Sequence, residues 1–239
     1  FSLARHFATL DHLSNGRTGW NIVASAGKSE ASNYGRNELL PHDDRYELAD
    51  EFVELCCRLW ESWEKDAGLM DRKSGEFADP RKVHRVEHVG KHFSCRGPLN
   101  VMRSPQVRPL LIQAGSSSRG LQFAAKHAEV QFAARGSAEG MKKYRKVLNE
   151  AMKLQGRTRA DFKVMWGVNV IVDETLEGAR AKQEALRSMV SMDGALALMS
   201  GHFNYDLSQL PPDEPIGSLQ TDGIQGIVDM VTQDFGQEV

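Results

Sequence analysis

The chain has 239 residues, 41% of them hydrophobic and 26% charged, which is enough apolar sequence for one substantial core. Its formal net charge of −2 does not favour binding to nucleic acid or to an anionic membrane surface. Three cysteines, two of them adjacent, argue against a disulfide framework and favour a reducing, cytoplasmic compartment.

The first half of the chain predicts helices around one strand and a long polar segment. It opens on Phe1 inside a helical pattern, over residues 3–13, and without methionine, so we interpret it as part of a longer protein. The apolar run 20–24 predicts a strand that carries one conspicuous polar residue, Asn21. Residues 25–44 are polar and contain glycine, and we expect such a long excursion to cover a site. An amphipathic helix follows over 44–63.

The second half alternates between strands and helices, which indicates a parallel sheet with helical crossovers. It is preceded by an extended hairpin arm, expected over 83–93. The expected strands are 110–112, 130–133 and 162–172. The expected helices are 121–128, 140–154, 175–190 and 226–235, with a loop over 208–215. No apolar run approaches the length of a membrane span, and no signal peptide is found.

The stretch 108–127 carries the strongest local signal for a ligand. A buried strand runs into a turn of Gly115 and three serines, 116–118, and a helix follows. Such a turn directs backbone N–H groups and hydroxyls to one point above the strand, and the positive end of the helix dipole adds to them. That point suits a phosphate. From these residues alone, an ordinary capped turn is the alternative.

Two further features involve histidine. His84, His88 and His92 recur every fourth residue, but the pattern around them is extended and no carboxylate–histidine zinc motif accompanies them. We therefore assign no metal site. His202 is expected in a polar loop after the last clear helix, and we consider it a candidate catalytic residue, with an exposed loop histidine as the alternative.

Three motifs, in this order along the chain, carry a family resemblance. The first is ARHFATLDHLSNGRTGWNIVAS at 4–25, the second is HDDRY at 42–46, and the third combines FSCRGPL at 93–99, RSPQ at 103–106 and QAGSS at 113–117. Together they resemble the nitrilotriacetate and dibenzothiophene-sulfone monooxygenases, a branch of the bacterial luciferase-like flavin enzymes. The likeness covers residues 1–135 well and the remainder more loosely.

The resemblance implies a (β/α)8 TIM barrel with FMN at the carboxyl ends of the strands. The whole chain, 1–239, would belong to that single domain, with the first three strands before Phe1, the fourth at 20–24 and the last after Val239. Three residues depart from the pattern of the family. Ala24 stands where threonine is frequent, Met102 where proline is common, and Val107 where glycine is common before Arg-Pro.

The resemblance also assigns five flavin contacts in this sequence. Asn21 would hydrogen-bond the isoalloxazine edge, because an amide supplies both a donor and an acceptor. His42 and Tyr46, four residues apart at a helix start, would face the phosphate or the ribityl chain. Ser116 and Ser117 would hold the phosphate.

The implied activity is that of a two-component flavin monooxygenase. Reduced FMN, supplied by a separate NAD(P)H-dependent flavin reductase, would react with O2 to give a C4a-peroxyflavin that oxygenates a small organic substrate such as a sulfone or an aminopolycarboxylate. The sequence has no GxGxxG motif after a strand, in agreement with a separate reductase. We further expect a homo-oligomer. A deazaflavin-dependent oxidoreductase and a non-catalytic flavin-binding relative are the alternatives.

Overall fold

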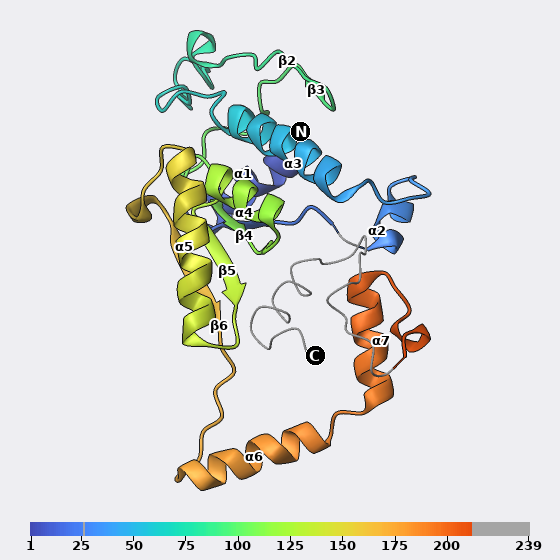
Figure 1. Cartoon of the computed structure of the whole chain (residues 1–239). Helices are drawn as coiled ribbons and strands as arrows, with labels where there is room; N and C mark the ends of the chain where they lie inside the picture. Colours follow the sequence, from blue (N-terminus) through green and yellow to red (C-terminus); the bar gives the residue numbers. More distant parts are fainter. Residues whose placement is uncertain (26, 212–239) are drawn as a thin grey trace.

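A computed structural model describes residues 1–25 and 27–211 of the chain (Figure 1). A four-stranded sheet in the order β1-β4-β5-β6 forms its centre, and all its paired strands are parallel, as the sequence predicts. The strands are β1 (Gly19–Ile22), β4 (Leu110–Gln113), β5 (Val130–Ala134) and β6 (Lys163–Gly167). Because the strands are parallel, their carboxyl ends lie at one edge of the sheet.

Helices cover one face of this sheet (Figure 1). They are α1 (Ser2–Ser14), α3 (His42–Trp60), α4 (Ser118–His127) and α5 (Ala138–Leu154). Trp20 and its register partner Leu111 are buried beneath them. The opposite face is open in this chain, since Phe132 and its partner Met165 are 47% and 56% exposed. One face of the strands is therefore packed and the other is free.

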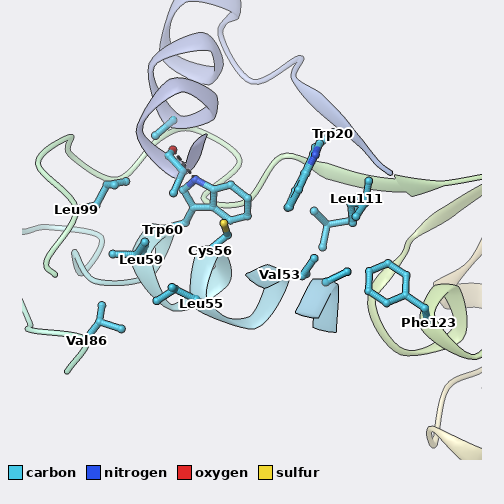
Figure 2. Packing of buried hydrophobic residues seen from close by; sticks show 14 of the residues in the cluster. Trp20, Val53, Leu55, Cys56, Leu59, Trp60, Val86, Leu99, Leu111 and Phe123 are labelled. Atoms are coloured by element: carbon cyan, nitrogen blue, oxygen red, sulfur yellow. Dashed lines mark hydrogen bonds between the residues drawn. The ribbon is translucent and has the colours of Figure 1, made fainter. Parts of the chain in front are cut away.

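The larger core cluster joins β1 to α1 and α3 (Figure 2). The ring of Trp20 lies edge-on against Trp60, with centroids 6.0 Å apart, and against Phe52, at 6.1 Å. Trp60 Nε1 donates a 2.8 Å hydrogen bond to the carbonyl of Ala4, which satisfies its one donor in the core. Cys56 lies beside these rings as a free thiol, and burial raises its pKa to about 12.

A buried carboxylate connects two of the sequence motifs. Asp11 of α1 accepts hydrogen bonds from the backbone N–H of Gln106, at 2.8 Å, and from its side-chain amide, at 2.5 Å. The same amide reaches the carbonyl of Thr18 at 2.9 Å. Burial alone would raise the pKa of Asp11, but these hydrogen bonds outweigh it and lower the pKa. The contact fixes the start of β1 beside the turn that leads into β4.

The long connection between β1 and β4 contains more structure than the sequence predicts. Its polar segment includes a short helix, α2 (Lys28–Asn33). An antiparallel hairpin pairs β2 (His88–Val89), within the expected arm, with β3 (Ser94–Cys95), just beyond its predicted end. A 3-10 turn, η1 (Pro80–Lys82), precedes the hairpin. Glu51 of α3 holds the hairpin by accepting from His88 Nε2 at 2.9 Å and from the backbone N–H of His92 and Phe93, both at 2.8 Å.

Several predicted boundaries are wrong. The helix α3 ends at Trp60, so Trp63 lies outside it and instead donates from Nε1 to the carbonyl of Leu99 at 2.7 Å. The strand β6 stops at Gly167, and the apolar run beyond it, which includes Val168 and Val170, is exposed. The remaining elements are η2 (Arg159–Asp161), α6 (Leu176–Ser188), α7 (Met192–Phe203) and η3 (Leu207–Gln209).

The region after α6 departs most from the sequence prediction. The apolar helix α7 was not predicted, and in Figure 1 it and α6 stand apart from the sheet. The helix predicted over 226–235 and the end of the loop over 208–215 lie outside the described residues. Within the part of the chain that the structure describes, no helix is long and apolar enough to cross a membrane.

Val107 adopts a strained backbone conformation. Its φ is +66°, in the left-handed region that glycine tolerates and a β-branched residue does not. The turn around it is closed by a 3.0 Å hydrogen bond from its own N–H to the carbonyl of Ser104. The position where the resembled family commonly has glycine is thus one where the backbone favours glycine.

We predict that Val107→Gly stabilises the protein. Relief of left-handed strain, about 1–2 kcal/mol, is partly offset by the entropy of glycine, about 0.5–1 kcal/mol, so the free energy of unfolding should rise by about 0.5–1 kcal/mol. Chemical denaturation measures this change. Val107→Ala is the control, because it shortens the side chain but keeps the Cβ atom. If the alanine variant gained as much as the glycine variant, strain at this position would not be the cause.

Candidate functional site

The amino-terminal ends of α3 and α4 meet at the carboxyl edge of the sheet. His42 is the first residue of α3, and Ser117 is the N-cap of α4. His42 Nε2 lies 3.2 Å from Ser117 Oγ, within hydrogen-bonding distance. Because each helix start carries a partial positive charge and free N–H groups, two such ends at one point favour an anion.

Tyr46 lies one turn further along α3, and its hydroxyl sits inside the β4–α4 turn. A Cβ atom on Gly115 would lie 2.5 Å from this hydroxyl and 2.4 Å from Gln113 Nε2. A Cβ atom on Gly120 would lie 2.8 Å from it. Burial raises the pKa of Tyr46, and hydrogen bonds with Ser117 and Gln113 oppose that rise. Because Gly115 and Gly120 carry no side chain, the Tyr46 hydroxyl can approach Ser117 and Gln113 in this turn.

A buried glutamine of β5 holds both the turn and the last residue of β4, which is also a glutamine. Gln131 of β5 is fully buried and donates to the carbonyl of Gly115 at 2.8 Å and to Gln113 Oε1 at 3.1 Å. The two are also register partners in neighbouring strands. Neither glutamine is among the site residues predicted from the sequence. Both are nevertheless polar signals of the same kind as Asn21, since one ends the apolar run 110–112 and the other lies in the next strand.

The structure brings three of the five predicted flavin contacts together, and the other two are Ser116 and Asn21. His42, Tyr46 and Ser117 converge, and Ser117 also accepts from the N–H of Gly120 at 3.1 Å. Ser116 is the preceding residue of the turn and is half-buried. Asn21 is exposed on β1, in register with Ile112, on the face of the sheet opposite the helices.

A cavity of about 570 Å³ opens next to Asn21. The polar segment 25–44 forms one wall of it through Ala31, Tyr34 and Leu39, while Phe52 of α3 lines another. This segment therefore lies over the carboxyl end of β1, where the sequence places a covering excursion. The lining is mainly apolar and aromatic, which is typical of pockets for small organic molecules.

A half-buried carboxylate lies one turn beyond Tyr46 on α3. Asp50 Oδ1 accepts from His127 Nε2 at 2.6 Å, and Oδ2 accepts from Arg119. The Arg119 guanidinium also lies 5.4 Å from the centroid of the Tyr46 ring. Burial alone would raise the pKa of Asp50, but the hydrogen bonds from His127 and Arg119 lower it to about 2. This carboxylate is therefore ionised at neutral pH and binds α3 to α4.

The histidines outside this site have other surroundings. His202 lies in the last turn of α7, so its assignment to a loop is wrong, and α7 packs against η3. Its catalytic role stays a prediction. His84 and His88 contact two different carboxylates, Glu64 at 2.6 Å and Glu51 at 2.9 Å. Among the described residues, no group of three histidines, cysteines or carboxylates could hold a metal ion.

Comparison with known proteins shows which family the chain resembles in sequence. The sequence pattern of the family described as luciferase-like monooxygenase matches residues 1–217. The chain is 41% identical over 222 residues to dibenzothiophene-sulfone monooxygenase of Rhodococcus erythropolis, covering 93% of this chain and 49% of that protein. It is 42% identical over 217 residues to nitrilotriacetate monooxygenase component A of Aminobacter aminovorans, covering 90% and 48%.

A solved structure agrees with these sequence matches. A riboflavin lyase, crystallised with modified FMN and riboflavin, superposes with a TM-score of 0.89 at 34% identity, over 99% of this chain and 55% of the lyase. The chain thus spans about half the length of the relatives that it matches. Its parallel sheet with helices on one face is part of the luciferase-like fold, and the resemblance read from the three motifs is confirmed. The chain belongs to the luciferase-like monooxygenase family.

Proposed function

We propose that the whole protein is a flavin-dependent monooxygenase that uses reduced FMN and O2 to oxygenate a small organic compound. One observation carries the proposal: the starts of α3 and α4 converge with His42, Tyr46 and Ser117 at one point. Two helix ends, an imidazole and two hydroxyls make a donor set that suits a dianionic phosphate. The family membership supplies the reaction class.

Each candidate residue has a proposed role in holding the cofactor. The hydroxyls of Ser117 and of the preceding Ser116 donate hydrogen bonds to the FMN phosphate, and the Tyr46 hydroxyl faces the same point. The His42 imidazole lies between Asp43, whose carboxylate is 2.7 Å from Nδ1, and Ser117, so its orientation is fixed from both sides. Asn21 offers its amide to the isoalloxazine edge.

The substrate and the partner follow from the same proposal. When bound, reduced FMN supplies the electrons with which O2 is activated, and the protein orients the substrate and excludes water. The apolar cavity beside Asn21 suits a small organic substrate. The names of the relatives point to a sulfone or an aminopolycarboxylate as the first compounds to test. A separate flavin reductase is the proposed source of reduced FMN.

Oxygen-isotope incorporation tests the proposed reaction. The intact protein, mixed with FMN, a flavin reductase, NADH and ¹⁸O₂, should insert one labelled oxygen atom into a sulfone or an aminopolycarboxylate, as measured by mass spectrometry. The same mixture without reductase should give no product. Tight flavin binding without any labelled product, over sulfones, amines, thioethers and alkanes, would instead indicate a non-catalytic flavin-binding protein.

Removal of one hydroxyl tests the phosphate site. In the intact protein, Ser117→Ala should raise the dissociation constant of reduced FMN roughly ten- to hundredfold, since a charge-assisted hydrogen bond contributes about 1.5–3 kcal/mol. Loss of the N-cap should also lower the free energy of unfolding by about 1 kcal/mol. Anaerobic flavin titration and chemical denaturation measure the two effects.

Ser137→Ala is the matched control for that variant. Ser137 caps α5 in the same way, accepting from the N–H of Gly140 at 3.0 Å. Its removal should cost similar stability but leave FMN affinity unchanged. If both variants bound FMN as tightly as the unmodified protein, Ser117 would be only a helix cap, and the phosphate site would lie elsewhere.

A further inference from the structure

Four side chains recur every fourth residue on α3 and form a polar stripe toward the β4–α4 unit: His42, Tyr46, Asp50 and Glu54. His42 and Tyr46 meet the turn at the candidate phosphate site. Glu54, at the far end, forms an exposed ion pair with Lys126 at 2.7 Å. Asp50 lies between these two regions.

Asp50 holds both ends of α4 with one carboxylate. Arg119, in the first turn of α4, donates to Oδ2, and His127, the last residue of α4, donates to Oδ1. The side chains of Asp50, Arg119 and His127 are only 20%, 23% and 9% exposed. Because water reaches them little, their interaction is screened less than that of a surface pair. A change at Asp50 would therefore remove a polar contact to α3 at each end of α4.

Two side chains of α4 contact the ring of Tyr46, so the position of α4 affects Tyr46. The Arg119 guanidinium lies over the Tyr46 ring, and Phe123 packs against it with ring centroids 5.5 Å apart. Phe123 in turn lies 4.9 Å from the ring of His127. A shift of α4 would therefore displace Ser117 at its start relative to Tyr46 on α3.

We propose that Asp50 is a positioning residue for the phosphate site. By fixing α4 along α3, it sets the spacing between Ser117 on one helix and His42 and Tyr46 on the other. The inference rests on the proposed function, since it assumes that these three residues hold the FMN phosphate. A change at Asp50 should therefore weaken the binding of the phosphate end of the flavin and not the binding of its ring.

Flavin selectivity tests the inference. Asp50→Asn keeps the shape of the side chain but removes its charge. In the intact protein, titrated without oxygen, this variant should bind reduced FMN about tenfold more weakly, because small misplacements of binding groups weaken a site at a distance. Its affinity for reduced riboflavin, which lacks the phosphate, should stay unchanged. Asp50→Glu, which restores the carboxylate, should recover part of the preference for FMN.

Glu54→Gln is the matched control, because Glu54 also links α3 to α4 but is exposed and one turn further from the site. It should leave both flavin affinities unchanged. His127→Gln keeps the Asp50 carboxylate and replaces one donor, so it tests the inference in the same titration if Asp50→Asn does not fold. The preference for FMN should fall in that variant also.

Three outcomes would overturn the inference. Equal weakening of FMN and riboflavin binding in Asp50→Asn would mean that the carboxylate only supports the fold. Unchanged or tighter FMN binding would mean that the phosphate site does not depend on it. If the unmodified protein bound riboflavin as tightly as FMN, the proposed phosphate site would itself be wrong. This failure is distinguishable from a failure of the inference about Asp50, because it is measured without any variant.

Discussion

The hydrogen bond between His42 and Ser117 joins the first residue of one helix to the N-cap of another, and the candidate site depends on it. Each helix start alone offers one set of free N–H groups to an anion. Brought together, they place two sets of free N–H groups and the Tyr46 hydroxyl at one point. The glycines of the turn permit this approach, since a side chain at Gly115 would collide with Tyr46.

The rest of the fold keeps these helix ends in place. Parallel strands put the start of each following helix at the same edge of the sheet, and the tryptophan cluster of Trp20 and Trp60 fixes α3 on β1. Asp11 ties α1 to the turn before β4, and Asp50 ties α3 to α4. The open face of the sheet, with Phe132 exposed, agrees with a chain that spans half the length of its relatives.

The sequence predicts this architecture where a periodic pattern and a family motif coincide. The strand and turn at 110–118 and the start of the helix near His42 are such places, and the structure brings His42, Tyr46 and Ser117 together there. Prediction fails where tertiary contacts decide: α3 stops before Trp63, β6 stops at Gly167, and α7 forms in a stretch of weak periodicity. Asp50 carries no local signal, because its partners Arg119 and His127 lie 69 and 77 residues away along the chain.

A crystal structure of the intact protein with FMN would show whether the phosphate binds where the starts of α3 and α4 meet. We expect a phosphate oxygen at hydrogen-bonding distance, about 2.6–3.2 Å, from Ser117 Oγ and from the Tyr46 hydroxyl, with the flavin ring toward Asn21. The imidazole of His42 should contact the phosphate or the ribityl chain. A phosphate bound elsewhere on the sheet edge, with the contact between His42 and Ser117 unchanged, would show that these helix starts do not form the phosphate site.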